Sequence, residues 1–181
     1  VKLTRYKSVM EKHATFTAAI ISLVSNLLSK ADGDLANSYI NEKKADKDLV
    51  IVINSNLGLC AGFNNDIYRY VEKNISKDNS IICPIGLKGD NYYKRENYDV
   101  ISNYVQLTER IVYEDVAKLA RLVKDEFLDG KYRSVKLVYT KYVNSIKFVP
   151  TLVNIFPLTK EENNEVNYPP IYDPDIKTLI D

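Results

Sequence analysis

The stretch from Asp48 to Asp66, DLVIVINSNLGLCAGFNND, decides the fold class of this chain. Its first part, Leu49 to Ile53, is a short continuous run of apolar residues, which is typical of a strand buried in a parallel sheet. A loop with two glycines follows, and Asn64-Asn65-Asp66 then offers side chains that cap the first turn of a helix. Strand, loop and helix in this order predict an α/β fold.

The segments that follow continue the alternation. The helix is expected to run to about Asn74, with Ile67, Tyr70 and Val71 on one face. Residues 80–87 predict a second strand, residues 88–97 form a charged segment, and residues 99–107 predict another short strand.

An amphipathic helix is expected from Thr108-Glu109 onward, with Gly130 as its C-cap. Its apolar residues share one helical face: Val112, Val116, Leu119, Ala120, Val123 and Phe127. Two strands, Arg133 to Val143 and Ile146 to Leu158, come next. Asn144-Ser145 suits a tight turn between them, so this pair predicts a hairpin at the sheet edge.

Residues 3–30 predict one long helix with a coiled-coil seam. Apolar positions recur every seventh residue in two series offset by three, without Gly or Pro, until ADGD at 31–34 ends the helix. The series are Leu3, Met10, Thr17 and Val24, and Tyr6, His13, Ile20 and Leu27. A long helix lying on its own domain is the alternative that this pattern leaves open.

The fold expected from these patterns is a small Rossmann-like α/β domain with a protruding N-terminal coiled-coil helix. The predicted domains are a stalk helix at 1–30, a connector at 31–47, the α/β domain at 48–158, and an acidic linker at 159–181. The end of this linker resembles an extended segment that precedes a further helix, which we expect this sequence only to begin. Because the chain begins at Val1 and not at Met, we expect it to be part of a longer protein.

Composition excludes several classes of function. Among 181 residues, 25 are basic and 24 acidic, and a formal net charge of +1 argues against a nucleic-acid partner. No apolar run approaches the roughly 20 residues of a membrane span, so we expect no direct membrane insertion. The two cysteines, Cys60 and Cys83, are expected to be reduced.

The pattern G-x-C-x-G at Gly58 to Gly62 raises the hypothesis of a cysteine nucleophile, as in cysteine-dependent amidotransferases. That chemistry requires a histidine base, with a carboxylate to orient it, downstream of the cysteine. The single histidine, His13, lies upstream on the heptad stripe. An enzyme using Cys60 is therefore kept only as the rival hypothesis.

Other site chemistries fail on spacing. Gly62 is followed by Phe63-Asn64, without the lysine of a P-loop, and the two loop glycines do not match a dinucleotide fingerprint. One histidine and two distant cysteines match no metal-ligand spacing. Asp48, Asp66 and Asp99 lie at the ends of elements, where turns and caps explain them. The residues alone thus predict a non-catalytic domain without cofactor or metal.

Several ordered blocks of the chain resemble one family. SNLGLCAGFNNDI, Ser55 to Ile67, resembles the signature S-D-[RK]-G-L-C-G-G-[LFY]-N of the gamma subunit of F-type ATP synthases. IGLKGDNYYKR, Ile85 to Arg95, is similar to the G-x-K-G segment of that family. Val123 to Ser145, Asn154 to Leu158, and PIYDPDIKTLID at 170–181 resemble later blocks in the same order.

The resemblance implies a non-catalytic rotor stalk. In that family, N- and C-terminal helices form an antiparallel coiled coil inside a ring of catalytic alpha and beta subunits. The α/β domain lies outside the ring, and it contacts an epsilon subunit and the membrane c-ring. Tyr172 and Asp173 match foot residues on the epsilon and c-ring side. The expected location is the cytoplasmic face of the membrane, in a peripheral complex that couples ion transport to ATP synthesis.

The resemblance implies that the stalk helix contacts its partners through the heptad positions Leu3, Met10, His13, Thr17, Ile20, Val24 and Leu27. In the signature loop, Gly58 and Gly62 are interpreted as backbone-permissive turn positions, Cys60 as a small buried residue, and Asn64 or Asn65 as the helix cap. These are structural roles and not catalytic ones.

Departures from the family pattern leave a second rotor hypothesis open. Asn56-Leu57 replaces the acidic and basic pair of the signature, and Ala61 replaces its second glycine. Tyr142 and Asp173 replace Phe and Glu in later blocks. A gamma-like rotor of a specialised rotary ATPase that drives another machine is therefore an alternative, and a scaffold domain whose helix pairs with an unrelated protein is a third.

Overall fold

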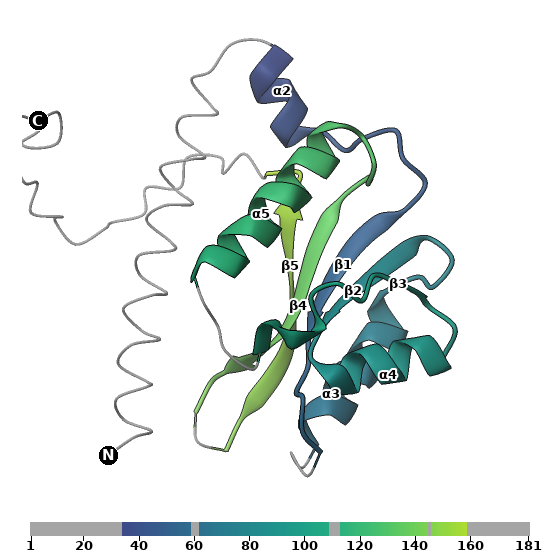
Figure 1. Ribbon diagram of the computed structural model, residues 1–181, viewed down its shortest axis with the longest axis vertical. Helices are drawn as coiled ribbons and strands as arrows, with labels where there is room; N and C mark the ends of the chain where they lie inside the picture. Colours follow the sequence, from purple (N-terminus) through teal and green to yellow (C-terminus); the bar gives the residue numbers. More distant parts are fainter. Residues whose placement is uncertain (1–33, 59–61, 109–112, 145, 159–181) are drawn as a thin grey trace, which may run out of the picture. The chain divides into compact units, whose positions relative to one another are not determined.

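The computed structural model describes residues 34–58, 62–108, 113–144 and 146–158 (Figure 1). In this part of the chain the helices are α2 Asp34–Ile40, α3 Phe63–Asn74, α4 Leu87–Arg95 and α5 Tyr113–Leu128, with a 3-10 turn, η1, at Val105–Thr108. The strands are β1 Asp48–Ile53, β2 Ser80–Ile85, β3 Asp99–Val100, β4 Val135–Tyr142 and β5 Phe148–Phe156. The stalk helix expected at residues 3–30 lies outside the described residues.

The five strands form one mixed sheet in the order β3-β2-β1-β4-β5. β1 lies at its centre and pairs in parallel with both β2 and β4. β4 and β5 pair antiparallel, with Tyr142 opposite Phe148 next to the connecting turn. The α/β fold class and the C-terminal hairpin at the sheet edge are therefore confirmed.

Helices cover both faces of the sheet. The side chains of β1 alternate between these two faces and contact helices on each of them. Val50 and Val52 point to the face of α3, where Ile67 and Val71 are fully buried. Tyr93 of α4 joins this cluster, in edge contact with Tyr68 and Tyr98. Leu49 and Ile51 point to the opposite face, where the buried stripe of α5 is Leu119, Val123 and Phe127.

α5 confirms part of the stripe expected from the sequence: Leu119, Val123 and Phe127 are buried, whereas Val116 and Ala120 are exposed and Val112 lies outside the described residues. Gly130 ends the helix as predicted. Gly130 has a φ of 79°, a left-handed conformation that favours glycine, and its N–H donates to the Phe127 carbonyl at 3.0 Å. Asn144 starts the hairpin turn, since its side-chain oxygen accepts the N–H groups of Ile146 and Lys147 at 3.0 and 2.8 Å.

Two expectations about local structure were wrong. Residues 88–95, expected only as a charged segment, and Leu87, expected at the end of the second strand, form α4, whose few buried positions hide its periodicity. The strand expected over 99–107 pairs only at Asp99–Val100 before the chain turns into η1. The segment at 31–47, expected as a connector, contains α2.

Candidate functional site

The side chain of Asn64 ties together the two ends of the loop between β1 and α3. The backbone N–H of Ser55 donates to Asn64 Oδ1 at 3.1 Å, and Asn64 Nδ2 donates to Ser55 Oγ at 2.7 Å. Ser55 Oγ in turn donates to the carbonyl of Leu57 at 2.6 Å. Ser55 and Asn64 occupy the first and last positions of the ten-residue signature, so these hydrogen bonds join its two ends.

Asn64 consequently does not cap α3, and that expectation was wrong. The N-cap of α3 is Gly62, and no side chain makes a capping hydrogen bond there. Asp66 lies in the first turn, where its negative charge suits the helix dipole, and its N–H donates to the carbonyl of Gly62 at 2.8 Å.

The same loop also holds the start of α4. Asn56 Oδ1 accepts the N–H of Leu87 at 2.9 Å, and the N–H of Lys88 donates to the Ser55 carbonyl at 3.0 Å. From the side of α3, the hydroxyl of Tyr68 donates to the Lys88 carbonyl at 2.9 Å. An amide therefore caps α4 at the position where the family signature has an aspartate.

The glycines that this arrangement requires are Gly86 and Gly89, rather than the loop glycines singled out from the sequence. Gly86 has a φ of 117°, and a Cβ added there would lie 2.3 Å from the Asn54 carbonyl oxygen. A Cβ on Gly89 would lie 2.2 Å from Asn54 Oδ1. The backbone carbonyl of Asn54 thus occupies the space beside Gly86, and the buried Asn54 side chain occupies the space beside Gly89.

The backbone explanation does not hold for the loop glycines. Gly62 has a φ of −76°, which any residue adopts, and the positive-φ glycines of the described chain are Gly86 and Gly130. A Cβ on Gly58 would make an ordinary contact, 3.7 Å from Lys88 Cε. Cys60 lies outside the described residues, so its burial stays a prediction.

A pocket of about 330 Å³ lies beside this loop, between Asn56, Leu87 and the segment after β3. Its carboxylate, Asp90, is buried and already accepts Ser102 Oγ at 2.5 Å and Lys94 Nζ at 2.7 Å. The first N–H groups of α4 are also engaged, since those of Gly89 and Asp90 both donate to the Gly86 carbonyl. The start of α4 therefore offers no free donor set for a phosphate.

The remaining site residues expected from the sequence lie outside the described part of the chain. These are Tyr172, Asp173 and the stalk positions Leu3, Met10, His13, Thr17, Ile20, Val24 and Leu27. Within the described residues, no group of His, Cys, Asp and Glu side chains is placed to hold a metal ion. No helix in these ranges combines the length and apolar character needed to cross a bilayer.

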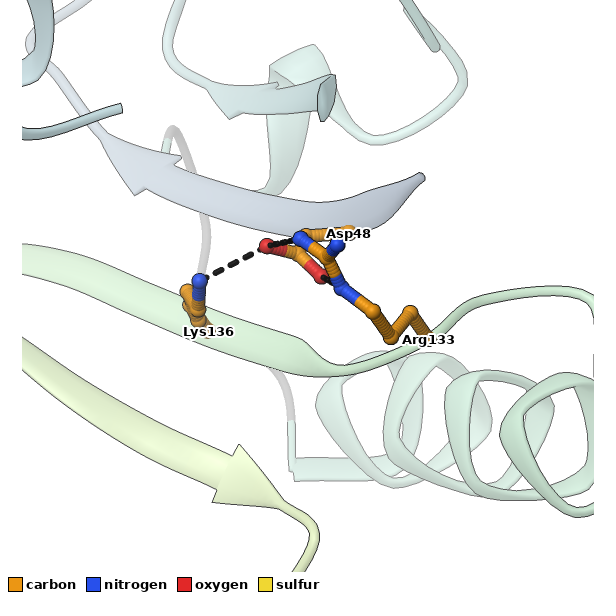
Figure 2. A network of polar contacts seen from close by, with 3 residues as sticks. All are labelled: Asp48, Arg133 and Lys136. Carbon is orange, nitrogen blue, oxygen red and sulfur yellow. Dashed lines mark hydrogen bonds and ion pairs between the residues drawn. The ribbon is translucent and has the colours of Figure 1, made fainter. Parts of the chain in front are cut away.

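An ion triad around the buried carboxylate of Asp48, at the amino end of β1, was missed from the sequence (Figure 2). Asp48 is 4% exposed; its carboxylate accepts Arg133 Nε and Nη2, each at 2.9 Å, and Lys136 Nζ at 2.7 Å. Burial alone raises the pKa of Asp48, but the hydrogen bonds from Arg133 and Lys136 outweigh it and hold that pKa below its usual value. The triad locks β1 to β4, a structural role that the turn-and-cap explanation did not foresee.

The only signal for the triad in the sequence was an acidic residue at the start of one strand and basic residues at the start of another. The partners lie 85 and 88 residues apart, so only the pairing of β1 with β4 brings them together. Asp99, by contrast, makes an exposed ion pair with Lys47 at 2.9 Å.

Comparison with known proteins identifies the family. A family model described as ATP synthase matches residues 1–181, and the chain belongs to this family. The resemblance drawn from the signature loop and the later blocks is thereby confirmed. Three sets of contacts lie within the blocks that carry that resemblance. They are the hydrogen bonds between Asn64 and Ser55 (called the Asn64 clasp below), the hydrogen bond from Leu87 to Asn56, and the close approach of Asn54 to Gly86 and Gly89.

The curated relatives share the name of one subunit. The chain is 29% identical over 162 residues to the ATP synthase gamma chain of Lachnoclostridium phytofermentans, covering 89% of this chain and 55% of that protein. It is 26% identical over 177 residues to the ATP synthase gamma chain of Mycoplasma capricolum subsp. capricolum, covering 96% and 61%. The chain thus spans roughly three fifths of the length of these relatives.

One solved structure supports the fold. A chain in the rotor of Euglena gracilis mitochondrial ATP synthase superposes with a TM-score of 0.50 at 15% identity, covering 84% of this chain and 58% of that one. At this level of identity the likeness extends to the fold alone.

Proposed function

We propose that the protein carrying this chain is the non-catalytic central-stalk subunit of an F-type rotary ATPase or ATP synthase. Its task is to transmit torque between a catalytic ring and a membrane ion-translocating ring. The family membership and the gamma-chain relatives support this proposal. The described domain contributes a rigid α/β body rather than a reaction site.

The observation that carries the proposal is the contact between Tyr39 and Leu158. The N–H of Leu158 donates to the Tyr39 carbonyl at 2.8 Å, and the rings of Tyr39 and Phe156 lie 6.3 Å apart. The chain therefore enters the domain through α2 and leaves it after β5 at neighbouring points. Because the chain enters and leaves the domain at neighbouring points, the segments that precede and follow it can reach one another, as a two-stranded stalk requires.

The stalk itself consists of the segments beyond these points. We propose that the N-terminal helix pairs through its heptad positions with a helix that follows Asp181, and that Tyr172 and Asp173 belong to the foot of the stalk. In this arrangement the domains are the stalk helix at 1–30, the connector at 31–47, the α/β domain at 48–158 and the linker at 159–181.

The proposed partners are catalytic alpha and beta subunits, an epsilon-type subunit and, where present, a c-ring. Catalysis belongs to the ring subunits, so this chain contributes neither catalytic residue nor cofactor. The complex is then peripheral, on the cytoplasmic face of the membrane.

Affinity purification of the tagged full-length protein tests the proposal. We expect stoichiometric recovery of catalytic ATPase subunits, and Ile20→Asp with Leu27→Asp on the seam should abolish that recovery. Recovery of wild-type protein as a stable monomer would contradict the proposal.

A gamma-like rotor of a specialised ATPase is the second candidate, and Leu57 favours it. This residue is 77% exposed at the position where the signature has Arg or Lys, so the surface here has lost a charge. Purification in mild detergent separates the candidates. A c-ring in the complex supports the ATP synthase, and catalytic subunits with another machine in place of a c-ring support the specialised rotor.

A further inference from the structure

The tip of the β4–β5 hairpin exposes a cluster of large apolar side chains. Ile146 is 94% exposed, Phe148 55% and Val143 48%, and Ile146 is the most exposed large apolar residue of the described chain. Single exposed apolar residues are ordinary, but a group at one tip marks an interaction site. Together with Lys141 and Lys147, these three residues are called the hairpin-tip surface below.

Hydrogen bonds join the two sides of the hairpin next to its turn. Asn144 Oδ1 accepts the N–H groups of Ile146 and Lys147, and the N–H of Val143 donates to the Lys147 carbonyl at 3.0 Å. The ring of Phe148 lies edge-on to that of Tyr142, with centroids 5.6 Å apart. The backbone of these residues is therefore held before docking, and docking would order mainly the exposed side chains.

All charged side chains of the hairpin are positive. Residues 134–159 contain three lysines and no Asp or Glu. Lys136 is neutralised by Asp48 near the start of β4. The side chains of Lys141 and Lys147 are exposed, and neither forms an ion pair with any residue that the structure describes. An unbalanced positive charge thus flanks Ile146.

Protection of a free sheet edge explains only part of this pattern. β5 is an edge strand, and both Pro150 and an exposed lysine are known guards against strand pairing. Guarding an edge gives no reason to expose Ile146 and Phe148. Because Pro150 lacks an N–H, it interrupts the row of donors and disfavours docking by an added strand.

The position of the surface leaves it accessible in the described domain. The tip lies at the carboxyl end of β4, whereas Tyr39 and Leu158, where the chain enters and leaves, lie at the opposite end of the sheet (Figure 1). Leu57 and Leu87, both exposed, lie at the same edge as the tip because β1, β2 and β4 are parallel.

We propose that the hairpin-tip surface docks onto an acidic protein surface of another chain, with Ile146 in an apolar recess and Lys141 and Lys147 facing carboxylates. The charge complementarity follows from the two lysines, which form no ion pair with the described residues, and the recess from the projecting isoleucine. This inference goes beyond the rotor function and rests on the side chains of this domain alone.

An anionic lipid surface would match the charge but not the shape. One whole acyl chain gives only marginal membrane binding, and stable anchoring takes a second strong signal. The hairpin-tip surface offers Val143, Ile146 and Phe148 but only two lysines, fewer than the roughly four to eight basic residues of a lipid-binding cluster. Ile146, the most exposed of the three apolar residues, fits a protein recess better.

Site-specific photo-crosslinking in cells tests the inference on the full-length protein. Benzoylphenylalanine replaces Ile146 in one strain and Leu122, on the outer face of α5 and 43% exposed, in the control strain. We expect a crosslink from position 146 to one other protein, mapped by mass spectrometry to a segment rich in Asp and Glu. The yield from position 122 should be at least fivefold lower.

Charge-reversal variants of the two tip lysines provide a second test of the inference. Lys141→Glu with Lys147→Glu should lower the crosslink yield at least fivefold, whereas Lys118→Glu with Lys124→Glu on α5 should leave it unchanged. Lys141→Ala with Lys147→Ala serves if the reversed variant folds poorly, and it should lower the yield at least twofold.

Three results would overturn the inference: a crosslink to lipid or to a second copy of this chain, an unchanged yield after charge reversal, or no yield above the control. Failure of the rotor function is recognised separately, as loss of catalytic subunits from the purified wild-type protein. If the charge-reversed variant still recovers the catalytic subunits and still forms the crosslink, the docking inference fails while the rotor function stands.

Discussion

The side chain of Asn54 occupies the space that any side chain at position 89 would need, with its Oδ1 only 2.2 Å from where a Cβ on Gly89 would lie. Asn54 directly follows the central strand and Gly89 lies in the first turns of α4, so this fit fixes the helix against the sheet. The Asn54 side chain is enclosed, with Asn54 2% exposed.

Gly89→Ala is therefore expected to destabilise the domain although alanine favours helices. We expect a net loss of about 2 kcal/mol in the free energy of unfolding, because overpacking a full core exceeds the propensity gain of about 1 kcal/mol. Urea unfolding of the full chain measures it, with Gly58→Ala as the matched control, since a Cβ there meets only an ordinary contact. Combining Gly89→Ala with Asn54→Ala should restore at least half of the loss, and additive losses would contradict the fit.

The Asp48 triad predicts a stability difference that disappears in acid. Asp48→Asn removes the buried carboxylate between Arg133 and Lys136 and should cost about 2 kcal/mol at pH 7. Because the folded-state pKa of Asp48 is lowered, this stability is fully present above the unfolded pKa of about 3.9 and is lost as pH falls through the folded value.

Chemical denaturation from pH 7 to pH 2.5 measures this dependence. The gap between wild type and Asp48→Asn should stay constant down to about pH 5 and shrink below about pH 4. The exposed variant Asp125→Asn should differ from wild type by less than about 0.5 kcal/mol throughout. A gap that grows in acid would show that the sign of the pKa shift is wrong.

The Asn64 clasp predicts a different outcome from a helix cap. Serine is a good N-cap, so Asn64→Ser would preserve stability if Asn64 capped α3. Because Asn64 instead bridges to Ser55, we expect Asn64→Ser and Asn64→Ala both to cost about 1 to 2 kcal/mol. Thermal unfolding compares them with Asn65→Ala, which should be near neutral, and a silent Asn64→Ser would refute the clasp.

Cys83 is expected to be inert in the folded protein. Burial and the nearby Glu126 carboxylate raise the pKa of its thiol to about 12, so the reactive thiolate is scarce at pH 8. In a Cys60→Ala background, an aromatic disulfide reagent should label no thiol natively and one thiol after denaturation. Native labelling within minutes would contradict the buried position.

Signals that act over a few residues were sufficient to predict much of this fold. The apolar run at Leu49 to Ile53 and the turn at Asn144 depend on neighbours in the sequence, and both were predicted, as were the buried α5 residues Leu119, Val123 and Phe127. α4 was not, because its place depends on Asn54, which is remote in sequence and fits against Gly89 only after folding.

In the candidate site, too, local signals were read from the sequence and long-range contacts were missed. Asn64 looked like a cap because capping is a local signal, yet its partner is Ser55, nine residues away across the loop. The Asp48 triad joins strands that are more than 80 residues apart, and no local pattern marks it. Family identity was available earlier, because it depends on the order of several blocks and not on any contact.

Rotation of the full-length protein against the proposed catalytic ring tests the central claim most directly. A bead attached through Lys118→Cys, on the exposed face of α5 and in a Cys60→Ala background, reports motion of the described domain while the catalytic subunits are fixed to a surface. We predict one-way rotation that starts with ATP and stops when ATP is removed. A bead that stays still while the attached complex hydrolyses ATP would contradict the rotor function.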